Sequence, residues 1–219
     1  MTKFRMRAAA LAGLAGLALG AAAHAAVIFS DFGAGDSYTQ DFGWTVQGGY
    51  SASAFQSSGD YDVTQIDLAL GHVSGTNAAV VSLWTNELGT LGTQLGSWGV
   101  SGQPTFGDFG AGALTSITNI SGVHLVAGGG YFLQVASTGD VLDAWNANSI
   151  GYLSDFVQNG VPFGPTTAGA FDVIGTSGVV PEPACWMMMM VGFGGLGSVL
   201  RRRRRAELAP YRDPRTKDS

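Results

Sequence analysis

Residues 63–70 read Val-Thr-Gln-Ile-Asp-Leu-Ala-Leu, and this stretch decides the expected fold class. Large apolar side chains stand at every second position, at Ile66, Leu68 and Leu70, with polar or small side chains between them. Successive side chains of a β-strand point to opposite faces, so this alternation predicts a strand with one face turned to a core. An amphipathic helix would repeat apolar residues three and four positions apart over several turns, and no stretch of the chain between residues 26 and 178 sustains that spacing.

Short apolar runs of this kind follow one another through the middle of the chain, separated by Gly, Ser, Asn and Asp. The other expected strands are 43–46, 50–55, 79–85, 94–100, 114–120, 123–126, 131–136, 141–145, 150–153 and 171–174. Strands at this spacing, with no helical pattern between them, are typical of an antiparallel β-sandwich or jelly roll. We therefore predict one all-β domain over residues 26–178, which is long enough to enclose one sizeable core.

The predicted domain contains no Lys or Arg, because all 11 basic residues of the chain lie within 3–7 and 201–217. It contains twelve acidic residues, so its net charge is strongly negative. Nucleic-acid binding requires cationic side chains that neutralise phosphates, and this composition therefore excludes a nucleic-acid partner. The carboxylates of the domain can find positive charge only in metal ions, solvent counterions or partner molecules.

Residues 1–25 have the three parts of a secretory signal peptide. A basic start with three Lys and Arg residues precedes an apolar stretch over 8–22, and Ala-His-Ala at 23–25 fits the small-x-small cleavage rule. We predict an N-terminal signal helix that is cleaved between Ala25 and Ala26. An uncleaved signal anchor is the alternative.

Residues 184–200 carry no charge. A block of five arginines follows directly: Arg201, Arg202, Arg203, Arg204 and Arg205. As a helix with a rise of about 1.5 Å per residue, the apolar stretch spans roughly 25 Å, close to the hydrocarbon core of a bilayer at about 30 Å. Trp186 stands at one border, where an indole favours the interface, and the arginine block resists translocation. We therefore predict one C-terminal transmembrane helix with the domain outside, and a buried helix of a globular domain is the alternative.

Pro181-Glu182-Pro183, Trp186, the methionine run at 187–190 and the arginine block stand in a specific order and spacing. Segment 179–205 thereby resembles the PEP-CTERM sorting signal in its proteobacterial Trp-and-Met variant. The resemblance implies that Pro181, Glu182 and Pro183 are recognised by an exosortase, a membrane-embedded cysteine protease that cuts near the motif. It also implies export across the inner membrane of a Gram-negative bacterium, transient anchoring there, and delivery to the cell surface or release.

Residues 206–219 depart from that family, whose members usually end soon after the arginines. This segment is polar and contains Pro, so we expect a disordered cytoplasmic extension. Within the domain, segments 80–84, 89–93, 96–98 and 125–133 place a strand and a Gly/Thr loop before a second strand, and a Leu-x-Ala-Gly-x-x-Tyr turn before a later one. This order is similar to that of the sandwich domains found before such sorting signals, which mostly have no assigned activity.

Aromatic residues of the domain are candidates for a sugar-stacking platform. They are Trp44, Tyr50, Trp84, Trp98, Tyr131, Trp145 and Tyr152. Most large aromatic side chains in a sandwich fill its core. Trp145 is followed by Asn146 and Asn148 in a polar, loop-like setting, so we choose these three residues as the expected exposed ligand platform.

Asp31, Asp36 and Asp41 lie in one Gly-rich stretch and are candidate calcium ligands, because Ca²⁺ prefers carboxylate and carbonyl oxygens. No calcium-loop consensus fits them, and solvated turn aspartates are the alternative. No other cofactor is expected. His72 and His124 are the only histidines of the domain, and we expect both to face solvent rather than to act in catalysis or bind zinc.

These features predict an exported protein of the cell surface or extracellular matrix that is structural or binds exopolysaccharide and is not an enzyme. The expected partners are an exosortase, inner-membrane lipid and exopolysaccharide. A secreted polysaccharide-active hydrolase and an ice- or surface-adhering protein are the alternatives. A pair of carboxylates converging in a cleft would favour the hydrolase, whereas a shallow aromatic platform would favour sugar binding.

Overall fold

The structure, a computed structural model, describes residues 25–107, 113–137, 139–177 and 193. The predicted signal peptide lies outside these residues apart from Ala25. The predicted sorting motif, transmembrane segment, arginine block and cytoplasmic tail also lie outside them, apart from Phe193. Among the described residues, no helix has both the length and the apolar character needed to cross a membrane.

The described part of the chain is all-β, as predicted, and forms fourteen strands. The strands are β1 (Ala25–Ser30), β2 (Tyr38–Gln47), β3 (Tyr50–Gln56), β4 (Tyr61–Leu68), β5 (Leu70–Ser74), β6 (Ala78–Glu87), β7 (Thr90–Ser101), β8 (Thr115–Thr118), β9 (His124–Leu125), β10 (Gly130–Ala136), β11 (Leu142–Asn148), β12 (Leu153–Gln158), β13 (Val161–Thr167) and β14 (Phe171–Ser177). Every pairing between these strands is antiparallel.

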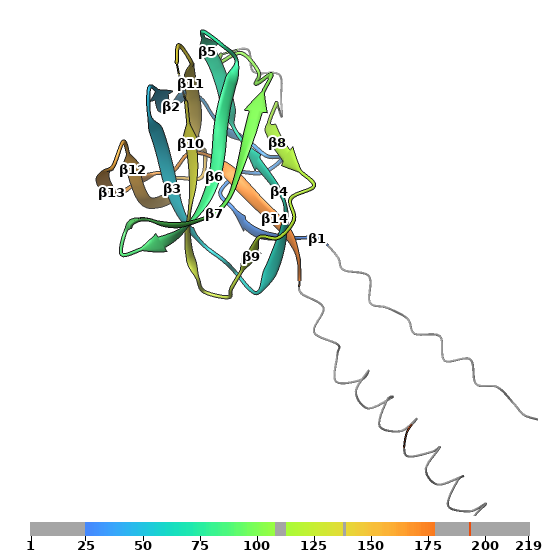
Figure 1. Ribbon diagram of the computed structural model, residues 1–219. Coiled ribbons are helices and arrows are strands. Elements are labelled where there is room, and N and C mark those ends of the chain that lie inside the picture. The colour runs from blue at the N-terminus through green and yellow to red at the C-terminus, as the bar shows by residue number, and fades with distance from the viewer. Residues whose placement is uncertain (1–24, 108–112, 138, 178–192, 194–219) are drawn as a thin grey trace, which may run out of the picture.

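The strands form three sheets, of which the two larger ones face each other (Figure 1). The six-stranded sheet has the order β13-β12-β3-β10-β6-β7. The five-stranded sheet has the order β1-β14-β4-β8, with β9 also paired to β4. One apolar cluster joins the sheets, since Leu68 of β4 and Val173 of β14 belong to the same core as Leu83 of β6 and Leu133 of β10. The architecture is therefore an antiparallel sandwich.

The third sheet, β2-β11-β5, continues the five-stranded layer. The chain changes partners at Ala69, because Leu68 pairs with Phe171 of β14 whereas Leu70 pairs with Trp145 of β11. The N–H of Ala69 donates to the carbonyl of Ala170 at 3.0 Å, and its carbonyl accepts from the N–H of Asn146 at 2.9 Å. These bonds keep the layer continuous at the change of partner.

The alternation in residues 63–70 is confirmed on its apolar face, where Ile66, Leu68 and Leu70 are completely buried. The opposite face is less exposed than the pattern predicts, because Asp67 and Ala69 are also buried. Ala69 packs in a second apolar cluster with Phe32 and Ala170. The outer face of this strand is therefore covered by segments distant in the sequence, which the alternation within residues 63–70 does not predict.

Three strands, β1, β5 and β13, are not predicted by the sequence pattern, apart from Leu70 at the start of β5, which ends the expected strand 63–70. β13 contains Pro162, Gly164 and Pro165, which usually mark turns. The two prolines are tolerated because β13 is the outermost strand of its sheet. A missing N–H on the free side of an edge strand breaks no hydrogen bond between strands. β12 begins at Leu153, where the expected strand 150–153 ends, because Gly151 takes a positive φ of 72° in the preceding turn.

The two ends of the domain lie side by side. Ala25 in the first strand is the register partner of Thr176 in the last. The chain therefore enters and leaves the sandwich at one end of the molecule (Figure 1). The predicted cleavage point between Ala25 and Ala26 stands at the start of β1.

Candidate functional site

A large open hollow lies between the edge strands of the two main sheets. β7 ends the six-stranded sheet and β8 ends the five-stranded sheet, and the two strands contact each other along one side of the sandwich (Figure 1). Between them lies an open groove of about 750 Å³, lined by residues 97–102 and 114–118. Its volume falls in the range of small-ligand sites, roughly 300–1,000 Å³.

Strand alternation decides which side chains border the groove. In β7, Trp98 and Val100 are half-buried toward the core, whereas Ser97 and Ser101 are exposed. In β8, the buried positions Thr115 and Ile117 alternate with exposed hydroxyl residues at 116 and 118. The exposed border of the groove is therefore made of hydroxyl groups, and apolar side chains lie beneath it.

Trp98 is the one large aromatic residue of the groove. A Cβ atom on Gly96 would lie 2.6 Å from both Cζ2 and Cη2 of Trp98, so the indole covers Gly96 at a distance that no larger residue would allow. The same Cβ would lie 3.3 Å from Cγ2 of Val123. The glycine at position 96 therefore makes room for the indole at the border of the core.

The indole N–H of Trp98 differs from those of the other described tryptophans. The N–H of Trp44 donates to the carbonyl of Thr167, that of Trp84 to Oε1 of Gln134, and that of Trp145 to the carbonyl of Ala170. No such acceptor serves Trp98 in the described part of the chain. Since Trp98 is only half-buried, its N–H is available to a ligand.

The groove lining carries no charged side chain. The nearest acidic residue in register is Asp67 of β4, which stands opposite Ser116. Asp67 in turn faces Asp172 of β14, and its N–H donates to Oδ1 of Asp172 at 3.3 Å. Burial and the neighbouring charge of Asp67 raise the pKa of Asp172 to about 7. This carboxylate pair lies outside the groove lining, so the groove lacks the paired acids that a glycoside hydrolase needs.

The expected ligand platform at Trp145, Asn146 and Asn148 is wrong, because all three residues are buried. They lie on β11, the central strand of its sheet, and Trp145 packs in the core against Phe171 with ring centroids 5.7 Å apart. Their polar groups join backbone segments instead of binding ligands. Nδ2 of Asn146 donates to the carbonyls of Thr39 and Gln40, each at 3.1 Å.

Asn148 joins the backbone in the same way. Its Nδ2 donates to the carbonyls of Tyr152 and Ala168, and its Oδ1 accepts from the N–H of Tyr152 at 2.8 Å. The polar residues after Trp145 are therefore not a loop. They are buried side-chain amides that form hydrogen bonds with backbone groups where the pairing between strands ends.

The calcium candidates do not converge. Asp31 is completely buried and its Oδ1 accepts from the N–H of Phe171 at 2.7 Å, whereas Asp36 lies exposed in a turn with a φ of 57° and Asp41 lies exposed on β2. Burial raises the pKa of Asp31 to about 7. Within the described ranges, no three His, Cys, Asp or Glu side chains form a group that could hold a metal ion.

The two histidines each pair with an aspartate. His124 is exposed, as expected, and its Nδ1 lies 2.9 Å from Oδ1 of Asp62. The expectation for His72 is wrong, because it is largely buried with its Nδ1 2.9 Å from Oδ1 of the fully buried Asp143. Burial raises the pKa of Asp143, and the hydrogen bond with His72 opposes that rise. No sequence spacing indicated this pair, which forms across β5 and β11.

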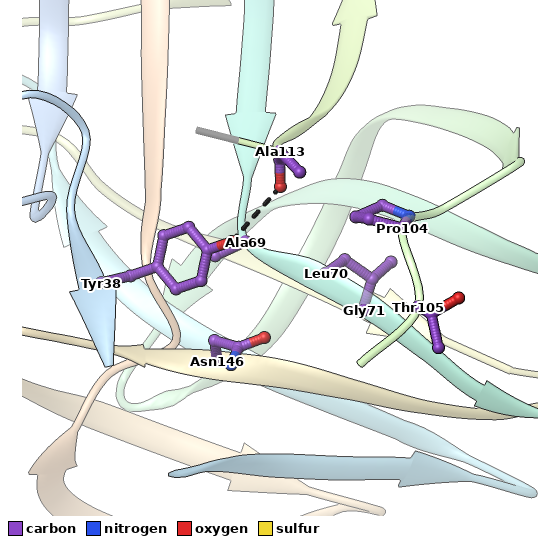
Figure 2. Close-up of a pocket in the computed structure, with 8 residues that line it drawn as sticks. All are labelled: Tyr38, Ala69, Leu70, Gly71, Pro104, Thr105, Ala113 and Asn146. Atoms are coloured by element: carbon purple, nitrogen blue, oxygen red, sulfur yellow. Dashed lines mark hydrogen bonds between the residues drawn. The ribbon is translucent and has the colours of Figure 1, made fainter. Parts of the chain in front are cut away.

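A second, much smaller hollow lies where β5 meets the segment after β7. Figure 2 shows Tyr38 on one side of it and Pro104 and Thr105 on the other. The hydroxyl of Tyr38 donates to the carbonyl of Ala113 at 3.4 Å. This hollow has a volume of about 10 Å³, which is room for about one water molecule. It is therefore too small for an organic ligand.

Trp98 is one of seven aromatic candidates in the sequence, and the polar residues after Trp145 favour Trp145 over it. The signal that distinguishes it is its neighbourhood, Gly96-Ser97-Trp98-Gly99, in which every neighbour is small. Neither the known family models nor the curated proteins contain a match to this chain.

Proposed function

We propose that the protein is an exported, non-enzymatic β-sandwich that binds polysaccharide in the groove between β7 and β8. The observation that carries this proposal is Trp98, a half-buried indole whose N–H has no acceptor among the described residues, in a groove bordered by hydroxyl groups. Flat indole surfaces suit the apolar C–H faces of sugar rings, and hydroxyl groups can both donate to and accept from sugar hydroxyls. The groove is open along the strands, which suits a chain longer than one sugar.

Delivery to the cell surface or extracellular matrix is the second part of the proposal. It rests on the signal peptide and on the resemblance of 179–205 to the PEP-CTERM sorting signal, with an exosortase as processing partner. The pairing of Ala25 with Thr176 supports it, because both predicted membrane-directed segments then adjoin the same end of the sandwich. A sandwich joined to the membrane at one end keeps its lateral groove accessible to polymers.

Binding is tested on the full chain in a zwitterionic detergent that contains no sugar, with retardation in gels containing a panel of polysaccharides. Trp98→Ala should weaken binding at least about tenfold, or about 1.4 kcal/mol of binding free energy. Trp84→Ala is the matched control, since Trp84 is also half-buried on the six-stranded sheet but donates its N–H to Gln134. It should bind like wild type.

Trp98→Phe keeps an aromatic ring and removes the N–H. This variant replaces Trp98→Ala in the binding test if the alanine variant does not fold. It should weaken binding by a factor of about five, as expected for one lost hydrogen bond of about 1 kcal/mol. Circular dichroism checks that each variant retains its β structure. The proposal fails if wild type binds no polysaccharide, or if folded Trp98 variants bind as tightly as wild type.

A further inference from the structure

We infer that the groove selects uncharged polysaccharides and rejects polymers rich in carboxylate or sulfate groups. The inference rests on the proposed function and names the chemical class of its ligand. Three features of the described residues carry it: the lack of free cations, the position of the nearest carboxylates, and the size of the side chains on the groove border.

No cation of the sandwich is free to bind an anionic group. The described ranges contain no Lys or Arg, and their two histidines are each engaged by a carboxylate, His72 by Asp143 and His124 by Asp62. Anionic sugars are usually held by Arg or Lys, which offer charge-assisted hydrogen bonds. Here a carboxylate or sulfate entering the groove would lose part of its hydration and gain no charged partner.

Carboxylates flank the groove on the β8 side. Asp67 stands directly across β4 from Ser116, and Asp172 stands on the next strand of the same sheet. Ser30 completes this row across β1, so the row contains acids and hydroxyls only. Asp67 is buried and Asp172 is partly buried, so these carboxylates offer an anionic polymer no favourable contact. Any repulsion from them should be strongest at low ionic strength, where charges act beyond the Debye length of about 8 Å at physiological salt.

The border of the groove suits neutral sugars in its size as well as its charge. A Cβ atom placed on Gly99 or Gly102 would meet no other atom within 4 Å, so open space lies above this part of β7. The neighbouring Ser97, Ser101 and Ser116 are exposed and carry one hydroxyl each. This open space lies on the outer face of β7, opposite the Trp98 side chain, so a neutral polymer can reach the hydroxyl groups of the groove border without displacing a bulky side chain.

The test measures binding of the full chain, in the same detergent, to a soluble neutral glucan and to polygalacturonate as the anionic probe. Both are measured at low salt with a chelator present. The neutral glucan should bind at least about tenfold more tightly. Ser116→Lys places a cation on the groove border and should strengthen polygalacturonate binding several-fold relative to binding of the neutral glucan by the same variant. Gln40→Lys, on exposed β2 away from the groove, is the control for net charge and should change neither.

The outcomes separate the inference from the proposed function. If polygalacturonate binds as tightly as the glucan through Trp98, the inference is overturned and polysaccharide binding stands. If polygalacturonate binds only when calcium replaces the chelator, a bridging cation supplies the charge and the inference is also overturned. If neither polymer binds, the proposed function itself fails.

Discussion

Replacement of Asp31 by Asn should change how the free energy of unfolding depends on pH. Asp31 is completely buried, its Oδ1 accepts from the N–H of Phe171 at 2.7 Å, and its Oδ2 has no hydrogen-bond partner in the described structure. Burial raises the pKa of Asp31 from 3.8 to about 7, against the smaller opposing effect of the backbone hydrogen bonds. The folded chain therefore holds this proton more tightly than the unfolded chain does.

The sign and size of the effect follow from this difference. Proton binding to Asp31 stabilises the fold fully below about pH 4, and this stabilisation is lost as the pH rises to about 7. A difference of about 3 between the two pKa values corresponds to about 4 kcal/mol in the free energy of unfolding. In the Asn variant, Oδ1 still accepts from Phe171, and Nδ2 is a buried donor without a partner, as the Oδ2 hydroxyl of protonated Asp31 is in wild type.

Asp31→Asn should therefore lie within about 1 kcal/mol of wild type near pH 4, and should be more stable than wild type by about 3–4 kcal/mol near pH 8. Urea unfolding followed by tryptophan fluorescence measures both values on the full chain. Asp172 also has a pKa raised to about 7 and is present in both proteins, and its charge makes only the smallest contribution to the raised pKa of Asp31. Asp41→Asn, at an exposed position on β2, removes one carboxylate without altering a buried group and is the control for the loss of charge. If the difference between Asp31→Asn and wild type does not vary with pH, Asp31 is ionised in the folded protein and the argument from burial is wrong.

Two further predictions concern the groove and the sorting signal. Gly96→Ala would bring a Cβ atom 2.6 Å from the Trp98 ring, so the indole must move and polysaccharide binding should fall at least about tenfold, whereas Gly99→Ala meets no atom within 4 Å and should bind like wild type. Equal affinities of the two variants in gel retardation would show that the position of the indole is unimportant. In cells with the exosortase, mass spectrometry should find the mature protein outside the inner membrane without the residues after about Pro183. An intact, membrane-bound chain in cells both with and without the exosortase would contradict processing.

Most of the strands could be predicted from the sequence, because alternation of apolar and polar residues is a local property of a strand. The strand over Tyr61–Leu68 is the clearest case, with Ile66 and Leu68 in the core. β13 could not be predicted, because its Pro162 and Pro165 are acceptable only at the edge of a sheet. Edge position depends on which distant strands pair. Burial of Asp67 and Ala69 likewise depends on covering segments far away in the sequence.

The candidate site shows the same division between local and distant causes. Trp98 and Trp145 both stand in strands among small or polar neighbours, and nothing in those neighbours says which indole is exposed. Trp145 is buried because β11 is the central strand of its sheet and Phe171 covers the ring. Trp98 borders a groove because β7 is an edge strand and β8 ends the opposite sheet beside it.

The sequence by itself determined the all-β class, the lack of cations between residues 26 and 178, and the terminal segments that predict export and sorting. These are properties of composition and of short-range pattern, which need no contact between distant residues. Only the tertiary structure decided which tryptophan is available to a ligand, which aspartates are buried, and that the two ends of the domain meet. Each of these depends on pairing between strands far apart in the chain, and such pairing is set by the packing of the whole sandwich rather than by any one stretch.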